Sequence, residues 1–359
     1  MKIAVYGASG YTGRLVLAEL ARRGITAVLI GRDPERLRAS AAGAGMPAAE
    51  TARAGLDDPA VLAGAFAGCA AVINCAGPFI TSGEPVVRAA IAAGCPYVDI
   101  SGEQLYLQRV FERLGQQAAD AGVTVVPGVN DDGLPSSLIA QLAAERVAPV
   151  SELVIALDLT RSGAAPSRGT LRSALANLAT FRDGGLSYDD GTWRPGMPAR
   201  RESATFPGEP DPAPVVKFPL PGVATIPRHV PASHVEGVAR AVLVEAFSQI
   251  TTDLIDAVPD GPSEASRAAA RWTVVAEAVG ADGRRARGVV SGPDTYGVTA
   301  IIAVESARQL ASQDTTPGVL APAQAFDPAG FLDFLTRCQA NWSIEAWPAV
   351  SGRVLSPAS

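Results

Sequence analysis

MKIAVYGASG YTGRLVLAEL ARRGITAVLI GR, residues 1–32, contains two short apolar runs separated by a glycine-rich turn and a stretch with helical spacing. The first run, residues 3–6, predicts a strand, and the apolar residues of 15–22 recur as on one face of a helix. The second run, residues 27–30, predicts another strand that ends at Gly31. Strand, glycine turn, helix and strand in this order are typical of the first half of a dinucleotide-binding unit.

The glycines of the turn are spaced G-x-x-G-x-x-G, a looser match than the usual G-x-G-x-x-G, but their place between strand and helix is specific. Gly7 lets the chain turn sharply out of the strand, Gly10 lets a diphosphate approach the backbone, and Gly13 lets the helix pack closely against the sheet. The helix then offers free N–H groups and a positive dipole end to the phosphates. Cofactor contacts are predicted for Gly7, Ser9, Gly10, Tyr11, Thr12 and Gly13.

Arg32, at the end of the second strand, indicates which dinucleotide the site takes. An NAD site usually has Asp or Glu at this place, to bind the ribose 2′-hydroxyl. Here the position holds a permanently charged guanidinium that suits a 2′-phosphate. Asp33 follows, but Asp33 and Pro34 look like the cap and first position of a helix. The sequence therefore predicts NADP rather than NAD.

Composition narrows the class of protein. The chain has 359 residues, 48% of them hydrophobic and 18% charged, which allows a sizeable core and about two domains. A net charge of −6 argues against nucleic-acid binding, and no run of apolar residues is long enough for a membrane span. Four dispersed cysteines and a strand near the first residue predict a cytoplasmic protein without a signal peptide. With two histidines in the chain, no metal site is expected.

The later strands of the first part end in small or polar residues. In a doubly wound sheet, ligands bind beyond the carboxyl ends of the strands. Cofactor contacts are therefore also predicted for Asn74, Cys75, Ala76 and Gly77 after one strand, and for Ser101 and Gly102 after the next. The candidate catalytic residues at the same edge are Asp99, Tyr97 and Asp132, with Glu103, Tyr188 and His229 as further candidates for the proton donor.

Strands and helices alternate up to about residue 135, and the pattern then changes to hairpins, loops and isolated helices. Residues 238–247 are expected to be helical, and residues 271–279 and 285–291 to form a hairpin. The predicted fold is α/β: an N-terminal Rossmann domain with a doubly wound parallel sheet, followed by an α+β domain on an antiparallel sheet. The expected boundaries are 1–135, 136–316 and 317–359, the last segment packing back on the Rossmann domain.

Several blocks together resemble the saccharopine dehydrogenase-like reductases, which include the trans-acting enoyl reductases. They are GASGYTG, IGR, NCAGPF, GEPVVRAAIAAGCPYVDISGE, VPGVNDDGLPSSL and GVATIPRHV, with the long block VEAVGADGRRARGVVSGPDTYGVTAIIAVESA and PGVLAPAQAF after them. The resemblance covers most of the chain and is specific for the family, but not for a substrate. It implies an NADP-binding Rossmann domain and a second domain that supplies part of the substrate pocket.

These observations predict an NADPH-dependent reductase of a C=C, C=N or C=O bond in a small or carrier-bound metabolite. Two alternatives stay open: a non-catalytic NADP sensor or partner protein, and an isomerase or cyclase that retains NADP. A reductase should leave room beside the nicotinamide, lined by both domains, whereas a sensor should fill it with side chains. A thiol mechanism through Cys95 is disfavoured by its place before a strand, and no Tyr-x-x-x-Lys pair exists. A homodimer is compatible with the sequence.

Overall fold

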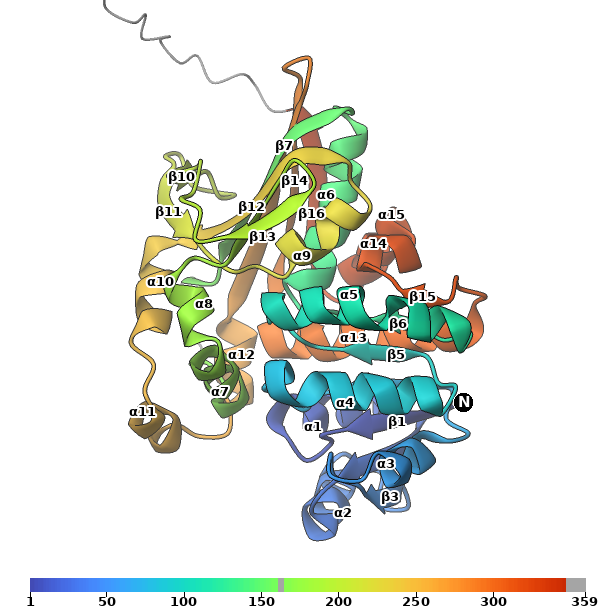
Figure 1. Cartoon of the computed structure of the whole chain (residues 1–359). Coiled ribbons are helices and arrows are strands. Elements are labelled where there is room, and N and C mark those ends of the chain that lie inside the picture. Colours follow the sequence, from blue (N-terminus) through green and yellow to red (C-terminus); the bar gives the residue numbers. More distant parts are fainter. Residues whose placement is uncertain (161–164, 347–359) are drawn as a thin grey trace, which may run out of the picture.

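The computed structural model describes residues 1–160 and 165–346, and its first part is a parallel sheet in the order β3-β2-β1-β4-β5-β6-β15 (Figure 1). Every neighbouring pair in this sheet is parallel. The chain order reverses between β1 and β4, which confirms the predicted Rossmann sheet. The strands are β1 (Lys2–Tyr6), β2 (Thr26–Gly31), β3 (Glu50–Arg53), β4 (Ala71–Asn74), β5 (Tyr97–Asp99), β6 (Thr124–Val126) and β15 (Gly318–Val319).

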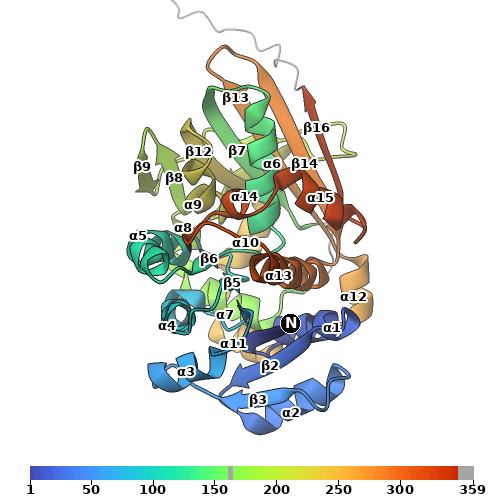
Figure 2. The ribbon, with the colours of Figure 1, turned by 90° about the vertical axis from the view of Figure 1, so that its right-hand side faces the viewer.

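Helices cover both faces of this sheet because alternate strand residues point to opposite sides. Ile3 and Val5 of β1 pack in the cluster that contains α1, α2 and α13, whereas Ala4 and Tyr6 pack with α3, α4 and α5. Figure 2 shows the two helical layers from the side. The bounds are α1 (Tyr11–Arg22), α2 (Pro34–Gly43), α3 (Pro59–Phe66), α4 (Phe79–Ala92), α5 (Gln104–Asp120) and α13 (Thr295–Ser312).

The second sheet has the order β10-β11-β12-β7-β13-β14-β16, with β8 pairing to β12 and to β9. The expected β13–β14 hairpin is confirmed. The sheet is mixed rather than purely antiparallel, because β12 runs parallel to β7 after a long crossover. The strands are β7 (Val150–Asp158), β8 (Leu186–Asp189), β9 (Thr192–Pro195), β10 (Ser203–Ala204), β11 (Ala213–Lys217), β12 (Ala232–Arg240), β13 (Arg271–Gly280), β14 (Arg285–Pro293) and β16 (Asn341–Ala346).

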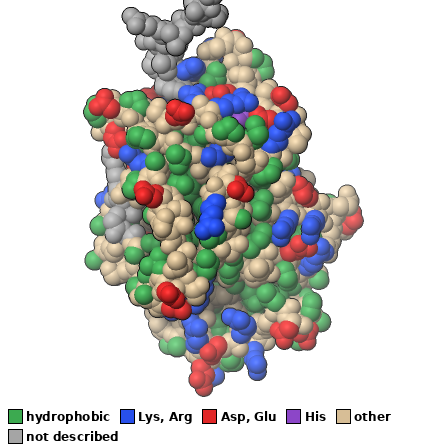
Figure 3. Space-filling model, turned by 60° about the vertical axis from the view of Figure 1, so that its left-hand side comes forward, with side chains coloured by type: hydrophobic (Ala, Val, Ile, Leu, Met, Phe, Trp, Pro, Cys, Tyr) green, Lys and Arg blue, Asp and Glu red, His purple; other side chains and the backbone are tan. Residues whose placement is uncertain are grey.

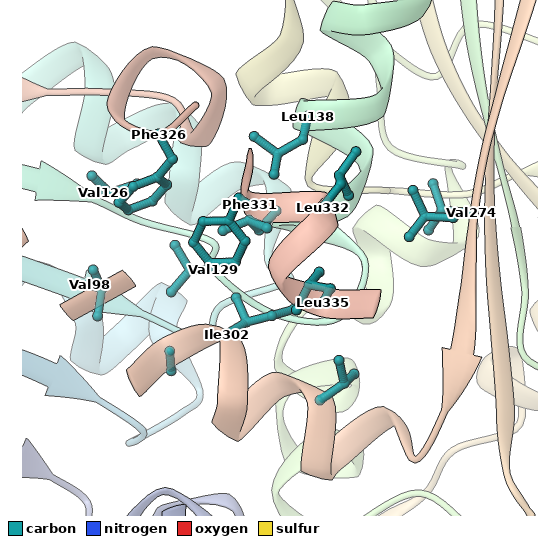
Figure 4. Packing of buried hydrophobic residues seen from close by; sticks show 14 of the residues in the cluster. Val98, Val126, Val129, Leu138, Val274, Ile302, Phe326, Phe331, Leu332 and Leu335 are labelled. Carbon is teal, nitrogen blue, oxygen red and sulfur yellow. The ribbon is translucent and has the colours of Figure 1, made fainter. Parts of the chain in front are cut away.

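The two sheets share one continuous hydrophobic cluster. Figure 4 shows part of it, where Phe331 of α15 lies between Val129, beyond the first sheet, and Leu138 of α6, with Ile302 of α13 close to Val129. The remaining helices are α6 (Gly133–Glu145), α7 (Arg168–Ala176), α8 (Leu178–Arg182), α9 (Gly222–Thr225), α10 (Ala241–Ser248), α11 (Thr252–Ala257), α12 (Glu264–Ala269), α14 (Pro322–Ala325) and α15 (Pro328–Thr336). Among the described residues, no helix is both long and apolar enough to cross a membrane.

Two segments differ in detail from the sequence-based expectations. The prediction of a helix over residues 238–247 is wrong at its start, because residues 238–240 complete β12 and α10 begins at Ala241. Residues 238–240 pair with β11, and Val238 and Ala239 also pair with β7. The segment after residue 316 contributes to both sheets: β15 pairs with β6 of the first, and β16 with β14 of the second. Helix α13 precedes this segment and packs on the Rossmann sheet beside α1.

Candidate functional site

The glycine turn after β1 is built so that only small residues fit. Gly7 has a φ of 77°, and a Cβ placed on it would lie 2.9 Å from the Cβ of Ala76. A Cβ on Gly13 would lie 2.3 Å from the carbonyl oxygen of Gly7, and one on Gly10 would lie 3.2 Å from the same oxygen. Any larger residue at Gly7 or Gly13 would therefore push α1 or the β4 loop away from the turn.

The first turn of α1 has the features of an anion site. Its cap residue, Gly10, provides no side-chain acceptor for the free N–H groups. By contrast, the neighbouring helices α2 and α3 are capped by Asp33 and Asp58, each of which accepts two backbone N–H bonds. A helix start without a capping acceptor, placed at the point where strand order reverses, fits the diphosphate of a dinucleotide.

The polar residues of the turn have different surroundings. Thr12 lines the large cavity described below, and Ser9 is half-buried, its carbonyl oxygen accepting a bond from Arg14. The Tyr11 side chain does not line this cavity. Its hydroxyl donates to the carbonyl oxygen of Pro262, 2.6 Å away. The backbone of Tyr11 belongs to the predicted cofactor turn, while its side chain contacts a segment far along the chain.

Arg32 lies where a 2′-phosphate group would be recognised. Its side chain is exposed just beyond β2, near Gly55 and Asp57. None of the ion pairs between described residues uses Arg32, so its guanidinium is available to an anionic ligand. Arg53, paired in register with Gly31 at the end of β3, adds a second exposed cation at this edge.

Beyond β4, small residues separate the glycine turn from the cavity. Cys75 and Gly77 line the cavity, and Ala76 packs against Gly7. Burial, together with the nearby charge of Asp99, raises the pKa of the Cys75 thiol to about 12, so this thiol stays protonated and unreactive at neutral pH.

Three predicted site residues instead form a buried hydrogen-bond network with Tyr106. Asn74 donates from Nδ2 to the Tyr97 hydroxyl at 2.9 Å, and its Oδ1 accepts from the backbone of Ala76. Tyr97 and Tyr106 both donate to Oδ2 of Asp99, at 3.0 and 2.6 Å. Burial raises the pKa of both tyrosines well above the usual range. Neither Tyr97 nor Asp99 lines the cavity, so the network positions the strand ends without contacting a ligand there.

Asp99 also organises the loops after β5 and β6. Its Oδ1 accepts the backbone N–H bonds of Ser101 and Gly128, at 3.0 and 2.9 Å. Ser101 is fully buried and its hydroxyl accepts from the backbone of Glu103. Of the two cofactor contacts predicted in this loop, Ser101 and Gly102, Gly102 is the one that lines the cavity.

A cavity of about 670 Å³ lies between the Rossmann strand ends and the second domain. One end is lined by residues after β4, β5 and β6 and by α13. The opposite wall comes from β7, α7, α8, α10, α11 and the segment after β11, and it is largely apolar. We call this side the apolar wall, consisting of Leu157, Leu159, Leu171, Phe181, Phe218, Leu243, Phe247 and Ile250. Two exposed hydrophobic residues, Val242 of α10 and Leu254 of α11, also belong to the cavity. Both helices lie on the left of Figure 1, and Figure 3 turns that side of the molecule forward.

Two adjacent carboxyls, Asp131 and Asp132, face the cavity from the loop before α6. Asn130 accepts the backbone N–H of Gly133 at the start of that helix, which leaves the Asp132 side chain free of a capping role. Oδ1 of Asp132 is buried and has no hydrogen-bond partner among the described residues. Burial raises the pKa of Asp132 to about 6, and burial with the charge of Asp132 raises that of Asp131 well above the usual range.

Helix α13 supplies residues of the site that sequence reasoning missed. Thr299 donates from Oγ1 to Oδ1 of Asp131 at 3.0 Å and accepts the backbone N–H of Asp131 at 3.1 Å. Tyr296 also lines the cavity, and its hydroxyl accepts the backbone N–H of Ser167. The order Tyr296-x-x-Thr299 places both residues on one helix face, which is the signal available in the sequence, but the sequence does not say what that face packs against.

The remaining proton-donor candidates have structural partners. Tyr188 packs against Trp193, and Glu103 accepts the backbone N–H groups of Phe79 and Ile80 at the start of α4. Although its side chain is engaged in this way, Glu103 is part of the cavity lining. Tyr188 and His229 do not line the cavity.

His229 carries a prediction about stability in acid. Its Nδ1 bonds to Oε1 of Gln141 at 2.8 Å and must donate there, so its Nε2 accepts from the Ser137 hydroxyl at 3.0 Å. Burial lowers the pKa of His229 to about 4, below the unfolded value of about 6.5. The unfolded chain therefore takes up this proton first, and stability should fall by up to about 3 kcal/mol between about pH 6.5 and pH 4.

Urea unfolding of His229→Gln between pH 7 and pH 4.5 checks this expectation. The variant should lose less stability on acidification than the unaltered protein does. His234, whose pKa is raised because its interactions with the nearby Glu236 and Asp189 carboxylates outweigh its burial, is the matched control. Its contribution is present in acid and lost as the pH rises, so His234→Gln should change the profile in the opposite direction. Equal slopes for His229→Gln and the unaltered protein would contradict the assignment.

Comparison with known proteins agrees with this architecture. Residues 3–126 match the family model of the saccharopine dehydrogenase NADP-binding domain. This part of the chain is therefore similar to the NADP-binding domain of the saccharopine dehydrogenases. The resemblance inferred from the sequence motifs is thereby confirmed, as is the cofactor class of the Rossmann domain.

Proteins similar to this chain include a trans-acting enoyl reductase of Mycobacterium tuberculosis, 34% identical over 140 residues, or 38% of this chain and 34% of the relative. A human saccharopine dehydrogenase-like oxidoreductase is 30% identical over 210 residues, 54% of this chain and 44% of the relative. The matches thus span less than half the length of these relatives. The solved saccharopine dehydrogenase (L-Glu forming) of Saccharomyces cerevisiae covers 96% of this chain and 100% of its own, with a TM-score of 0.61 at 14% identity, and shows the shared fold.

Proposed function

We propose that the protein is an NADPH-dependent reductase that transfers hydride to a C=C, C=N or C=O bond of a metabolite held in the cavity between the domains. The observation that carries this proposal is the cavity itself. It opens along the strand ends, where a Rossmann domain binds its dinucleotide, and it is lined by both domains.

The two ends of the cavity favour different parts of a substrate. Asp131, Asp132 and Thr299 form a polar end close to the loops after β5 and β6. The apolar wall has no charged side chain and suits a hydrocarbon portion. An α,β-unsaturated acyl group on a small or carrier-bound thioester meets both requirements. The relatives named trans-acting enoyl reductases support this choice of substrate class.

When bound, the reduced dinucleotide supplies the hydride. The protein's own residues hold the other groups in place. The glycine turn and the first N–H groups of α1 bind the diphosphate, and Arg32 binds the 2′-phosphate. The Asp131–Asp132 pair, with both pKa values raised, holds a proton beside the substrate, and Thr299 fixes Asp131 next to Asp132. The apolar wall excludes water, which strengthens these electrostatic interactions.

This geometry favours a reductase over a non-catalytic sensor. A sensor has no need of space beside the nicotinamide, whereas this cavity leaves about 670 Å³ between the strand ends and the second domain. A cavity with carboxyls of raised pKa at one end is the arrangement expected where a proton must be delivered.

The direct test is the loss of NADPH absorbance at 340 nm with a panel of enoyl thioesters, imines and ketones of differing chain length. We expect turnover with at least one class and binding of NADPH measured by fluorescence. Binding of NADPH without consumption, together with conversion of a substrate, would favour the isomerase or cyclase alternative. No binding of either nicotinamide dinucleotide would contradict the proposal.

The apolar wall leads to a prediction for Phe247→Ala. Phe247 stacks on Phe181 at 5.4 Å between ring centroids and meets Phe218 at 5.8 Å, so the three rings form one surface of the cavity. Removing the ring should raise KM for long-chain substrates about tenfold and leave short ones unchanged, because less apolar area is then buried by the chain. Phe334→Ala on α15, outside the cavity, is the control. An equal effect at all chain lengths would argue against this role.

A further inference from the structure

Residues 258–262, which connect α11 to α12, lie directly on the glycine turn; we call them the strap. Gly261 is so close to Tyr11 that a Cβ on it would lie 2.4 Å from the tyrosine ring. The Tyr11 hydroxyl donates to the carbonyl oxygen of Pro262 at 2.6 Å. This hydrogen bond joins positions 251 residues apart in the chain. The strap is thus held by a side chain of the turn that the dinucleotide is expected to occupy.

Asp260 of the strap connects the same turn to the cavity. Its carboxylate lies 3.5 Å from Arg14 of α1 and 3.5 Å from Arg168, the first residue of α7. Arg168 also donates to the carbonyl oxygen of Val258, and its backbone N–H donates to that of Asp260. Helix α7 and helix α11 on either side of these contacts both contribute to the cavity lining.

Tyr296 completes a second connection between turn and cavity. Its ring meets that of Tyr11 edge-on, with centroids 5.2 Å apart. Its hydroxyl accepts the backbone N–H of Ser167 at 2.6 Å and bonds to Thr170, both at the start of α7. Tyr296, which lines the cavity, therefore fixes the start of α7, and Tyr11 of the glycine turn packs against the Tyr296 ring.

The far end of the strap is anchored to the Rossmann side. Ser263 caps α12, and Arg267 of that helix forms an ion pair with Asp294 at 2.6 Å. Asp294 in turn caps α13, which packs on the Rossmann sheet. The strap therefore runs from α11, which lines the cavity, across the glycine turn to α12, which is bound to the start of α13 on the Rossmann sheet.

We propose that Tyr11 is a positioning residue that couples the two ligands, so that dinucleotide in the glycine turn strengthens binding in the apolar cavity through the strap and α7. This inference rests on the proposed binding of NADP(H) in the turn. A ligand that holds the turn in one conformation also fixes the Tyr11 ring, and with it the strap and the start of α7. Because coupling between two sites is reciprocal, a cavity ligand must strengthen dinucleotide binding by the same factor.

The test measures this coupling without turnover. The cavity probe is 1-anilinonaphthalene-8-sulfonate, titrated by fluorescence with and without saturating NADP⁺. NADP⁺ should tighten binding of the dye about 5-fold or more in the unaltered protein. Tyr11→Phe removes one hydrogen bond and keeps the ring. In this variant the coupling factor should fall about threefold, because the loss of one hydrogen bond changes the free energy by a comparable amount. Gly261→Ala, which pushes the strap off the ring, should reduce it further.

Tyr188→Phe is the matched control, since Tyr188 lies outside the cavity and the strap. It should leave the coupling factor unchanged. Loss of dye affinity in Tyr11→Phe to the same extent with and without NADP⁺ would show an ordinary structural role and overturn the inference. The inference would also be overturned if the protein without substitutions bound NADP⁺ and its affinity for the dye did not change. Absence of NADP⁺ binding would instead contradict the proposed function itself.

Discussion

Asp132→Asn should lower kcat of the proposed reduction about 100-fold or more while leaving KM for NADPH nearly unchanged. The carboxyl faces the cavity with an unpartnered, buried Oδ1, and its pKa is raised to about 6. A positioned general acid contributes about 10²–10⁴-fold to rate, and asparagine keeps the shape of the side chain without the transferable proton. In the unaltered protein, kcat should fall as the pH rises through the apparent pKa values of the Asp131–Asp132 pair.

The same substitution should make the folded protein more stable at neutral pH. The folded pKa of Asp132 lies above the unfolded value of about 3.9, so its contribution to stability is present below that value and lost as the pH rises through about 6. At pH 7.5 the fold must hold a carboxylate that would be more favourable in water. Asparagine removes this cost, and we expect a gain of up to about 2–3 kcal/mol. Loss of rate with gain of stability is characteristic of a catalytic group kept in an unfavourable environment.

Steady-state kinetics over pH 5–9 and urea unfolding at pH 5 and pH 7.5 check both expectations. Asp282→Asn, on the exposed turn between β13 and β14, should change neither quantity by much. If Asp132→Asn keeps the rate and its pH profile, the proton comes from another donor, and the carboxyl pair has a different role. If it lowers the rate and also destabilises the fold at pH 7.5, the loss is structural.

The glycine turn and the parallel strands could be predicted from sequence because their causes are local. Gly7 is needed for a positive φ, and Gly10 and Gly13 for close approach of backbone to backbone, all within one short segment. Apolar runs alternating with helices specify a parallel sheet, and a parallel sheet brings its strand ends to one edge. The expectation of a site at that edge needs no knowledge of the second domain.

The direction of individual side chains at the same edge depends on distant packing. Asn74, Tyr97 and Asp99 follow the pattern of site residues, yet their side chains bond to one another and to Tyr106 beneath the edge. Thr299 reaches the carboxyl pair because α13 returns to the Rossmann sheet from a distant part of the chain. The sequence pattern of β4 and β5 does not distinguish a buried polar side chain from one that lines the cavity, because both occupy equivalent positions in the strands. Likewise, the helical spacing of α13 does not say that Thr299 faces the carboxyl pair.

Arg32→Ala should weaken binding of NADPH about 10- to 100-fold and leave NADH almost unaffected. A hydrogen bond from the guanidinium to a phosphate oxygen contributes about 1.5–3 kcal/mol to binding, and NADH lacks the 2′-phosphate that would accept this bond. The exposed guanidinium of Arg32 has no ion-pair partner among the described residues, so it is free to bind this group. Arg32→Lys should recover part of the affinity, because lysine keeps the charge but not the forked pair of donors.

Calorimetric titration of both dinucleotides at two salt concentrations measures this discrimination. Arg38→Ala, an exposed arginine farther along α2, controls for a general loss of positive charge. Should Arg32→Ala weaken NADPH and NADH equally, the residue would act on a part common to both dinucleotides, and the preference for NADP would need another source such as Arg53. A selective loss with Arg32→Ala and none with Arg38→Ala would tie cofactor choice to one guanidinium at the end of β2, since that position distinguishes a bound 2′-phosphate from a hydroxyl.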